Sequence, residues 1–250
     1  MIFTGISRGF HCLRVSPLTT FTAELTEMMV ERLVLFRTRN GNNLPQRIVV
    51  FRDGVSEGQF RLVLTEELPA MRAAFAKLGQ GYTPKLSIIV CAKRHQTRFY
   101  PTEQEVGGDE SGNTRPGTVV DVGVTSNFGQ DFFLQAHHAL QGTAKPTHYY
   151  PIYDELNWKA DDLQAVINAL SYNFPRASKA ISLVTPAYCA DLACERARCY
   201  LREYLDGKDS DNQSVATETS DAVRDHAFER AKRDWGRGVH DRLKDTMFYL

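Results

Sequence analysis

The sequence lacks the features that mark several classes of protein. None of its apolar stretches approaches the roughly 20 consecutive apolar residues of a membrane-spanning helix. Its first 16 residues, MIFTGISRGFHCLRVS, contain neither a long apolar core nor a small-residue cleavage site, which a secretory signal would need. There are only five cysteines, and no two of them are separated by two residues, as in a zinc knuckle. We therefore expect an intracellular protein with reduced thiols, in the cytoplasm or alternatively in the nucleus.

The composition is that of a folded protein whose charge is unevenly distributed. At 250 residues, 42% hydrophobic and 24% charged, the chain can bury one substantial core, which excludes a disordered chain and a disulfide-stabilised mini-protein. The net charge is zero, but residues 205–225 hold six acidic residues against two basic ones, so this stretch carries −4 and the rest carries +4. A mildly basic body fits a polyanionic partner, although a surface of mixed charges is the usual outcome.

The first third of the chain predicts alternating helices and strands. Apolar residues recur at three- and four-residue spacings through residues 22–39, which indicates an amphipathic helix. RIVVFRDG (47–54) and LSIIVCA (86–92) are apolar, β-branched runs typical of buried strands. Between them, residues 56–78 form a helical stretch with an expected interruption at Pro69. This order favours parallel pairing of the two strands through a right-handed crossover.

The remainder predicts short strands followed by long helices. Two alternating runs resemble a hairpin: TVVDVGV (118–124) and DFFLQAHHAL (131–140). A third run, THYYPIY (147–153), is extended. Helical periodicity marks residues 161–174 and 186–205. A polar loop with several Gly and Pro residues occupies 101–117. The acidic, Ser/Thr-rich segment 206–222 is expected to be a disordered insert.

Several of these segments contain residues that can carry chemistry, each with an ordinary structural alternative. Asp53 stands at the carboxyl end of a predicted strand, where open α/β sheets bind ligands, so it is either a metal-binding carboxylate or a turn aspartate. KRHQTR (93–98) places three permanent cations at a strand exit and either contacts phosphates or is a solvated loop. The run 145–150, KPTHYY, either combines phosphate contacts with base stacking or consists of half-buried strand residues.

Two further candidates carry weaker signals. His137 and His138 are expected to alternate faces within a strand, so they cannot both ligate one ion, and we assign them no metal. Asp191 comes early in a predicted helix, where the helix dipole favours a carboxylate in any protein.

Five longer motifs, taken in order, resemble one protein family. They are RIVVFRDGVSEGQF (47–60), KLSIIVCAKRHQTRFYP (85–101), NTRPGTVVDVGVT (113–125), FFLQAHHALQGTAKPTHYYPIYDE (132–155) and VTPAYCADLACERARCYL (184–201). Together they resemble the Piwi domain of eukaryotic Argonaute proteins. The resemblance covers about residues 9–204 and resumes at GVHDRLKDTMFYL (238–250), so that residues 1–250 are similar to a partial Piwi domain, truncated at its N-terminus. It implies an α/β, ribonuclease-H-like fold, a mixed sheet flanked by helices, which lacks the first strands and leaves a sheet edge unpaired.

The resemblance also implies roles for individual residues. Asp53 matches a catalytic aspartate at a strand end, and Asp191 stands where many members have histidine, so both would be catalytic ligands of Mg²⁺. Arg196 matches the arginine that reaches the 5′-phosphate of the guide RNA. Further residues match positions that line the guide backbone: Lys93, Arg98, Lys145, Arg176, Ser182 and Tyr188. The chemistry agrees, because lysine and arginine neutralise phosphates and hydroxyls donate hydrogen bonds to phosphate oxygens.

The sequence departs from the family pattern at the cleavage site. The family's first catalytic aspartate lies upstream of the matched segments, and residues 1–23 contain no Asp or Glu. Phe21 aligns with a glutamate of active members, and Glu24 stands about one helical turn away. Asp53 and Asp191 are too few for a two-metal site, because several carboxylates must offset the two metal charges. We therefore expect Mg²⁺ binding to be weak or absent and autonomous cleavage to be lacking.

Three hypotheses for function follow. The first is an RNA-binding Piwi domain that contacts the guide RNA and the guide–target duplex in RNA interference and small-RNA gene silencing. The alternative is a metal-dependent endoribonuclease, which requires that upstream sequence supply the missing aspartate. A third is a protein-interaction module for tryptophan-containing silencing partners. None of the three involves a membrane.

Overall fold

The computed structural model describes most of the chain as two compact units. The described residues are 2–6, 18–102, 112–126, 129–205, 229–231, 233–235 and 239–250. The first unit, which holds the sheet, comprises Met1–Ile6, Pro45–Leu64 and Thr83–Ala190. The second unit, which is helical, comprises Ser7–Leu44, Thr65–Tyr82 and Asp191–Leu250. The predicted acidic insert 206–222 lies outside the described residues, so its predicted disorder stays a prediction.

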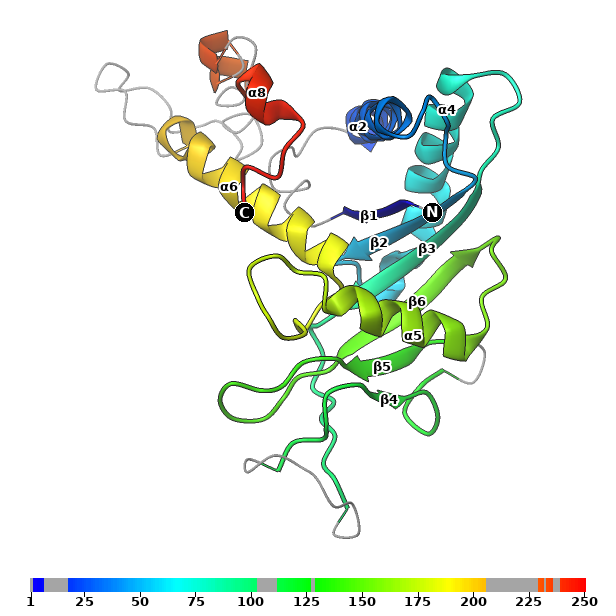
Figure 1. Ribbon diagram of the computed structural model, residues 1–250, viewed down its shortest axis with the longest axis vertical. Helices are drawn as coiled ribbons and strands as arrows, with labels where there is room; N and C mark the ends of the chain where they lie inside the picture. Colours follow the sequence, from blue (N-terminus) through cyan, green and yellow to red (C-terminus); the bar gives the residue numbers. More distant parts are fainter. Residues whose placement is uncertain are drawn as a thin grey trace. The chain divides into compact units, whose positions relative to one another are not determined.

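A six-stranded mixed sheet organises the first unit, in the order β1-β2-β3-β6-β5-β4 (Figure 1). Its strands are β1 (Ile2–Ile6), β2 (Arg47–Asp53), β3 (Lys85–Ala92), β4 (Thr118–Val120), β5 (Phe132–Gln135) and β6 (Thr147–Asp154). The first three strands run parallel to one another, whereas β6, β5 and β4 join antiparallel. The predicted parallel pair of strands, the hairpin-like pair and the mixed sheet are therefore confirmed.

Two register pairs bring the ends of three strands to one edge of the sheet. Asp53, the last residue of β2, lies opposite Cys91 near the end of the parallel strand β3. Ala92, the last residue of β3, lies opposite His148 near the start of the antiparallel strand β6. The carboxyl ends of β2 and β3 and the amino end of β6 therefore meet at the same edge. At this edge the chain leaves β2 after Asp53 and leaves β3 at Lys93, and it enters β6 after Pro146.

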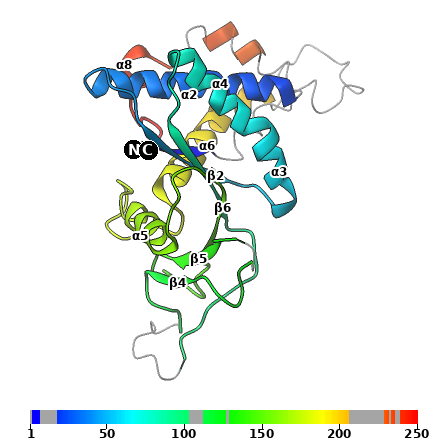
Figure 2. The ribbon, with the colours of Figure 1, turned by 90° about the vertical axis from the view of Figure 1, so that its right-hand side faces the viewer.

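Alternating side chains give this sheet two different faces. The main core forms on one face from side chains of the strands, of α5 (Ala160–Ser171) and of the segment that begins α6 (Thr185–Leu205): Val49, Phe51, Ile89, Cys91, Phe132, Leu134, Ala136, Tyr149, Leu163, Ile167, Leu183, Val184 and Ala187. Helix α5 covers this face, and the short helix α3 (Phe60–Leu62) lies on the opposite side of the strands (Figure 2). The predicted helices 161–174 and 186–205 are confirmed, with small changes at their ends.

A bulge interrupts the pairing of β6 with β3. The register shifts between Ile88, which lies opposite Tyr153, and Ile89, which lies opposite Pro151. Proline has no N–H to donate to the ladder, so a central strand tolerates it best at such a bulge. The extra residue on the β6 side is Ile152.

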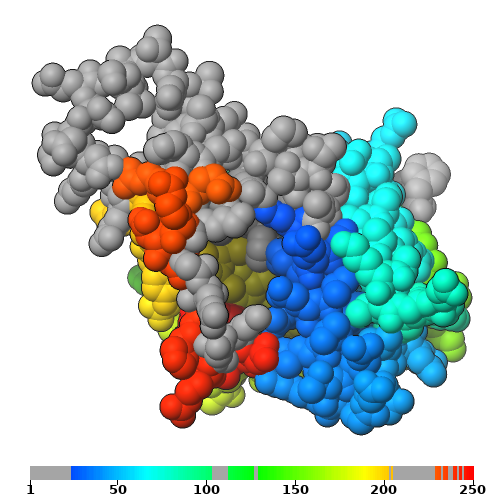
Figure 3. All heavy atoms as spheres, turned by 90° about the horizontal axis from the view of Figure 1, so that it is seen from above, coloured from blue at the N-terminus to red at the C-terminus, as the bar shows by residue number. Residues whose placement is uncertain are grey.

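Helices α2 (Leu18–Arg39), α4 (Leu68–Leu78) and α8 (Asp241–Lys244) belong to the second unit. Helices α2 and α4 lie side by side, drawn in blue and cyan in Figure 3, and the Thr26 hydroxyl of α2 donates a hydrogen bond to the Ala70 carbonyl of α4 at 2.9 Å. The guanidinium of Arg39 donates to the Asp245 carbonyl at 2.9 Å, which ties the end of α2 to the C-terminal segment. The predicted helix 22–39 is confirmed and begins four residues earlier.

The helical stretch after β2 is interrupted just before the expected position. A 3-10 turn (Glu57–Gln59), α3 and a π-helical turn (Val63–Glu67) precede α4. Pro69 is the second residue of α4, within the first turn of that helix, where proline is tolerated. The π-helical turn therefore marks the interruption, and α4 begins at Leu68, directly before Pro69.

One expectation of the sequence analysis is wrong, and one strand was missed. No strand was predicted before residue 47, but β1 pairs with β2 from Ile2↔Ile48 to Ile6↔Arg52 and is a terminal strand of the open sheet. His137 and His138 do not alternate within a strand, because β5 ends at Gln135. Among the residues that the structure describes, no helix is long and apolar enough to cross a membrane.

Candidate functional site

The strand exits bring two lysines and a hydroxyl together at the sheet edge. Lys93 follows β3 directly, and Lys145 lies two residues before β6. The Lys93 ammonium donates a hydrogen bond to the Ser182 hydroxyl, and the Thr147 hydroxyl donates to the Ser182 carbonyl. The sequence predicts each of these residues as a contact of the guide backbone but does not predict that they meet: Lys93, Lys145 and Ser182. The antiparallel pairing of β3 with β6 brings the two lysines to the same edge. We refer to these three residues, with His95 and His137, as the basic edge.

The electrostatics of Lys93 show how this edge is charged. Burial lowers the pKa of Lys93, and the nearby positive charge of Lys145 lowers it further, whereas Asp53 raises it. Two cations therefore repel each other in partly desolvated surroundings, and the Asp53 carboxylate offsets only part of that repulsion. A bound anion would relieve the repulsion, so the basic edge is suited to a phosphate.

His95 and Arg98 extend the basic segment beyond Lys93. The His95 ring donates from Nε2 to the Pro146 carbonyl at 3.0 Å, which fixes the segment after β3 against the one before β6. Burial lowers the pKa of His95, and the charge of Lys145 also lowers it, so this ring is a neutral donor near pH 7. Arg98 is half-buried, and its guanidinium donates to the Thr97 carbonyl at 2.7 Å.

His137 is a member of the basic edge that the sequence analysis missed. Burial lowers its pKa to about 4, and the charges of Lys93 and then His138 contribute to the same shift. Its Nδ1 atom is buried and makes no hydrogen bond within the described part of the chain. The register explains its place, because Leu134 of β5 lies opposite Thr147, so the chain that leaves β5 runs beside the chain that enters β6. Sequence alone gave no signal for the early end of β5.

The remaining predicted guide contacts in the first unit lie between α5 and the start of α6. Tyr188 packs edge-on against Phe174 at 4.9 Å between ring centroids and is half-buried. Arg176 is exposed in the segment between the two helices. The backbone N–H of Val184 donates to the Tyr149 hydroxyl at 3.1 Å, which fixes the segment that carries Ser182 against the sheet.

The two predicted catalytic aspartates belong to different units. Asp53 ends β2 in the first unit, whereas Asp191 lies on α6 in the second. Among the described residues, no three His, Cys, Asp or Glu side chains gather into a group that could hold a metal ion. Mg²⁺ requires a near-octahedral set of oxygen ligands, so the described residues do not by themselves fit a magnesium centre.

Arg196 and Arg198 are both exposed on the part of α6 that belongs to the second unit. The Arg196 guanidinium lies over the ring of Tyr200, 6.0 Å from its centroid, which orients the side chain along the helix surface. The structure places Arg196 within the second unit only, so its predicted contact with a guide phosphate stays a prediction.

Comparisons with known proteins agree with these arrangements. The pattern of the Piwi domain family matches residues 11–202. Protein argonaute MEL1 of Oryza sativa subsp. japonica is 42% identical over 228 residues, which cover 89% of this chain and 20% of that protein.

Two solved structures have a similar fold. The chain superimposes on the C-terminal lobe of a budding yeast Argonaute with a TM-score of 0.74 at 33% identity, covering 91% of this chain and 44% of that one. Kluyveromyces polysporus Argonaute with a guide RNA gives a TM-score of 0.75 at 33% identity, covering 91% of this chain and 25% of that one. The chain spans about a fifth of the length of the curated relatives it matches. Together, the motifs, the sheet order and these matches establish that the chain belongs to the Piwi domain family of Argonaute proteins.

Proposed function

We propose that this Piwi domain binds a small guide RNA, and the target RNA paired to it, as part of small-RNA-mediated gene silencing. The observation that carries the proposal is the basic edge, where Lys93, Lys145 and Ser182 converge at the ends of β3 and β6. The Kluyveromyces polysporus structure, which contains a guide RNA, supports the choice of ligand because its fold is similar to this one.

The chemistry of the basic edge favours the RNA backbone over the bases. Ammonium groups and hydroxyls contact phosphate and sugar oxygens, and such contacts position an RNA without reading its sequence. Neutral His95 and His137 add hydrogen-bonding groups without adding charge. Binding should therefore depend on salt and be indifferent to base sequence. We propose the same kind of contact with the RNA backbone for three further residues: Arg98, Arg176 and Tyr188.

The test is a salt titration of RNA affinity. The chain is titrated with a short 5′-phosphorylated RNA at several salt concentrations, and the slope of log K against log salt is compared with that of the triple variant Lys93→Ala, Arg98→Ala, Lys145→Ala. If each cation neutralises one phosphate, the magnitude of the slope falls by about 2–3 units.

A matched triple variant controls for the general electrostatic field. Arg61, Lys85 and Lys159 are exposed cations of the first unit, and none of them follows β3 or precedes β6. Their replacement by alanine lowers the net charge by the same amount and should leave the slope nearly unchanged. Equal slopes for both triple variants, or an unchanged slope for the first, would show that the basic edge is only a solvated surface.

Mg²⁺ and tryptophan-containing silencing proteins are further parts of this proposal. The resemblance implies both, with Asp53 and Asp191 as the implied metal ligands. We expect Mg²⁺ binding to be weak or absent, without cleavage, and calorimetry with MgCl₂ measures it. Binding of a tryptophan-containing peptide would be measured separately, in the presence and absence of RNA.

A further inference from the structure

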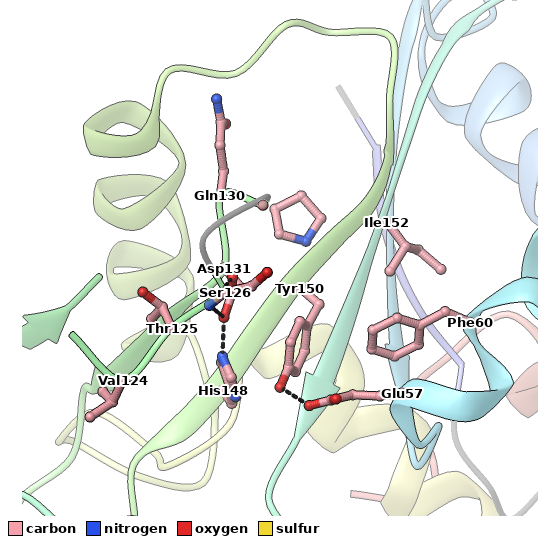
Figure 4. Close-up of a pocket in the computed structure, with 12 residues that line it drawn as sticks. Glu57, Phe60, Val124, Thr125, Ser126, Gln130, Asp131, His148, Tyr150 and Ile152 are labelled. Atoms are coloured by element: carbon pink, nitrogen blue, oxygen red, sulfur yellow. Dashed lines mark hydrogen bonds and ion pairs between the residues drawn. The ribbon is translucent and has the colours of Figure 1, made fainter. Parts of the chain in front are cut away.

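An open pocket of about 520 Å³ lies on the face of β6 that is turned away from the main core. Tyr149 points into the core beneath α5, so its neighbours His148 and Tyr150 point to the other face, where they line the pocket. The 3-10 turn after β2 and the loop before β5 supply the other walls (Figure 4). The pocket lining includes none of three residues of the basic edge: Lys93, Lys145 and Ser182.

The pocket is acidic. Glu57 and Asp131 line it, and its described lining contains no lysine or arginine. Glu57 accepts a hydrogen bond from the Tyr150 hydroxyl at 2.6 Å, and Asp131 accepts from His148 at 2.7 Å and from the Ser126 N–H at 3.0 Å (Figure 4). Burial lowers the pKa of His148, although Asp131 opposes the shift, so the ring is neutral near pH 7. The hydrogen bonds therefore hold both carboxylates in place without cancelling their charge.

The remaining walls are aromatic and aliphatic. The Tyr150 ring lies 5.1 Å from Phe60 and 3.9 Å from His148, measured between centroids, so three rings form a continuous row. Ile152, which the bulge of β6 adds to the strand, and Val124 supply aliphatic surface. Val124 is 53% exposed, so the pocket presents an apolar side chain to solvent. Aromatic and aliphatic walls with a few placed polar groups are typical of ligand-binding pockets.

We propose that this acidic pocket binds the guanidinium group of an arginine side chain presented by a protein partner. The planar cation can lie against the Tyr150 and Phe60 rings while its N–H groups donate to the carboxylates, and its aliphatic stem packs on Val124 and Ile152. Arginine is favoured over lysine, because a planar guanidinium can lie flat against an aromatic ring and donate to two carboxylates at once. The pocket disfavours a nucleotide, because two carboxylates would repel the phosphate and the described lining holds no lysine or arginine to offset that repulsion. This inference goes beyond RNA binding and involves residues outside the basic edge.

The first test uses the unaltered chain, so it does not depend on any variant folding. A short peptide with one central arginine is titrated into the protein, with the same peptide carrying citrulline as a neutral, isosteric control. We expect at least about tenfold tighter binding of the arginine peptide, with NMR shifts of the Val124 and Ile152 methyl groups. Equal affinity for the two peptides, or shifts confined to other methyl groups, would overturn the proposal. Tighter binding of guanosine monophosphate than of the arginine peptide at those methyl groups would also overturn it and point to a nucleotide site.

Variants then separate the charge from the aromatic surface. Glu57→Gln keeps an acceptor for the Tyr150 hydroxyl but removes the charge, and we expect it to reduce the arginine-over-citrulline preference by about tenfold. Asp162→Asn removes an exposed carboxylate of α5 in the same unit and should leave the preference unchanged. Tyr150→Leu should weaken binding of both peptides, and retained RNA affinity would show that this variant is folded. A Glu57→Gln variant with an undiminished preference would contradict the proposed role of the pocket.

Discussion

The two faces of one sheet differ in charge and in the partners that suit them. The basic edge gathers Lys93 and Lys145 at the strand ends near Ser182, whereas the acidic pocket holds Glu57 and Asp131 on the face of β6 turned away from the main core. The two regions adjoin, because the His95 ring lies 6.4 Å from the His148 ring. In the basic edge, burial and the neighbouring charge of Lys145 lower the pKa of Lys93, so an anion is favoured. In the acidic pocket, hydrogen bonds hold two carboxylates beside aromatic rings, so a cation is favoured. A net charge of zero therefore reveals little about what this chain binds.

The difference arises from strand alternation and strand ends. Tyr149 and Tyr150 are neighbours in the chain, but one hydroxyl accepts a hydrogen bond from Val184 in the core and the other donates to Glu57 in the pocket. The basic residues belong to segments that leave or enter the sheet at one edge. One scaffold can therefore support two sites, and the following predictions test whether the sites are independent.

The largest expected effect comes from the core that both sites share. Ile89 is fully buried in β3, and Ile89→Ala should lower the free energy of unfolding by about 2–5 kcal/mol, because it removes buried apolar surface and leaves a cavity. Denaturant unfolding measures this loss, and binding at both sites should fall together. Lys85→Ala, at the exposed start of the same strand, should change stability by less than about 0.5 kcal/mol. Loss of binding at one site alone would mean that the sites do not share this core.

A smaller effect tests whether RNA recognition reaches the second unit. Arg196→Ala should weaken binding of 5′-phosphorylated RNA relative to 5′-hydroxyl RNA by about 1.5–3 kcal/mol, because a charge-assisted hydrogen bond is lost. Arg198 lies about 200° around the helix from Arg196, so Arg198→Ala is the matched control and should leave the preference intact. Equal weakening of both RNAs by Arg196→Ala would restrict phosphate recognition to the first unit.

The next effect concerns the pH dependence of the basic edge. The pKa of His137 is lowered to about 4 in the folded state, whereas an unfolded histidine titrates near 6.5. Between these values the unfolded state binds more protons, so stability falls as the pH falls from about 6.5 to 4. His137→Gln should remove about 1–2 kcal/mol of this decline, a range that allows for the partial exposure of the ring. Unfolding curves at pH 7 and pH 4.5 measure the difference, and parallel declines in both proteins would contradict the assignment.

The smallest effect concerns Asp53, which lies beside the cations of the basic edge. With a guide-paired RNA and Mg²⁺ or Mn²⁺, we expect no cleavage. Asp53→Asn should tighten RNA binding by about 0.2–1 kcal/mol, because a negative charge near the phosphates is removed. Gel analysis measures cleavage of the RNA, and a binding titration measures the change in RNA affinity. Cleavage opposite the guide centre that Asp53→Ala abolishes would instead identify an active endoribonuclease.

Much of the fold could be predicted from local patterns. The apolar runs at 47–53 and 85–92 have no polar alternation, so they form the buried parallel strands β2 and β3. The spacing of Leu25, Met29 and Leu33 predicts the buried stripe of α2. These elements are dictated by side-chain burial, which the sequence displays directly.

The parts that could not be predicted depend on contacts between distant segments. His137 joins the basic edge because β5 ends early and runs antiparallel to β6, and neither fact can be inferred from QAHHAL. The acidic pocket combines Glu57, Asp131 and Tyr150, which are far apart in sequence and carry no shared motif. β1 was missed because its pairing with β2 is a tertiary contact of a segment without a clear strand pattern.

The most direct test of the central claim is hydrogen exchange of the chain with and without a short 5′-phosphorylated RNA. The account predicts that RNA slows exchange in the segments around Lys93 and Lys145 and at residues 182–184, while the pocket segments around Glu57 and at 124–126 exchange at unchanged rates. Protection over the pocket segments, with none around Lys93 and Lys145, would contradict the assignment of RNA to the basic edge.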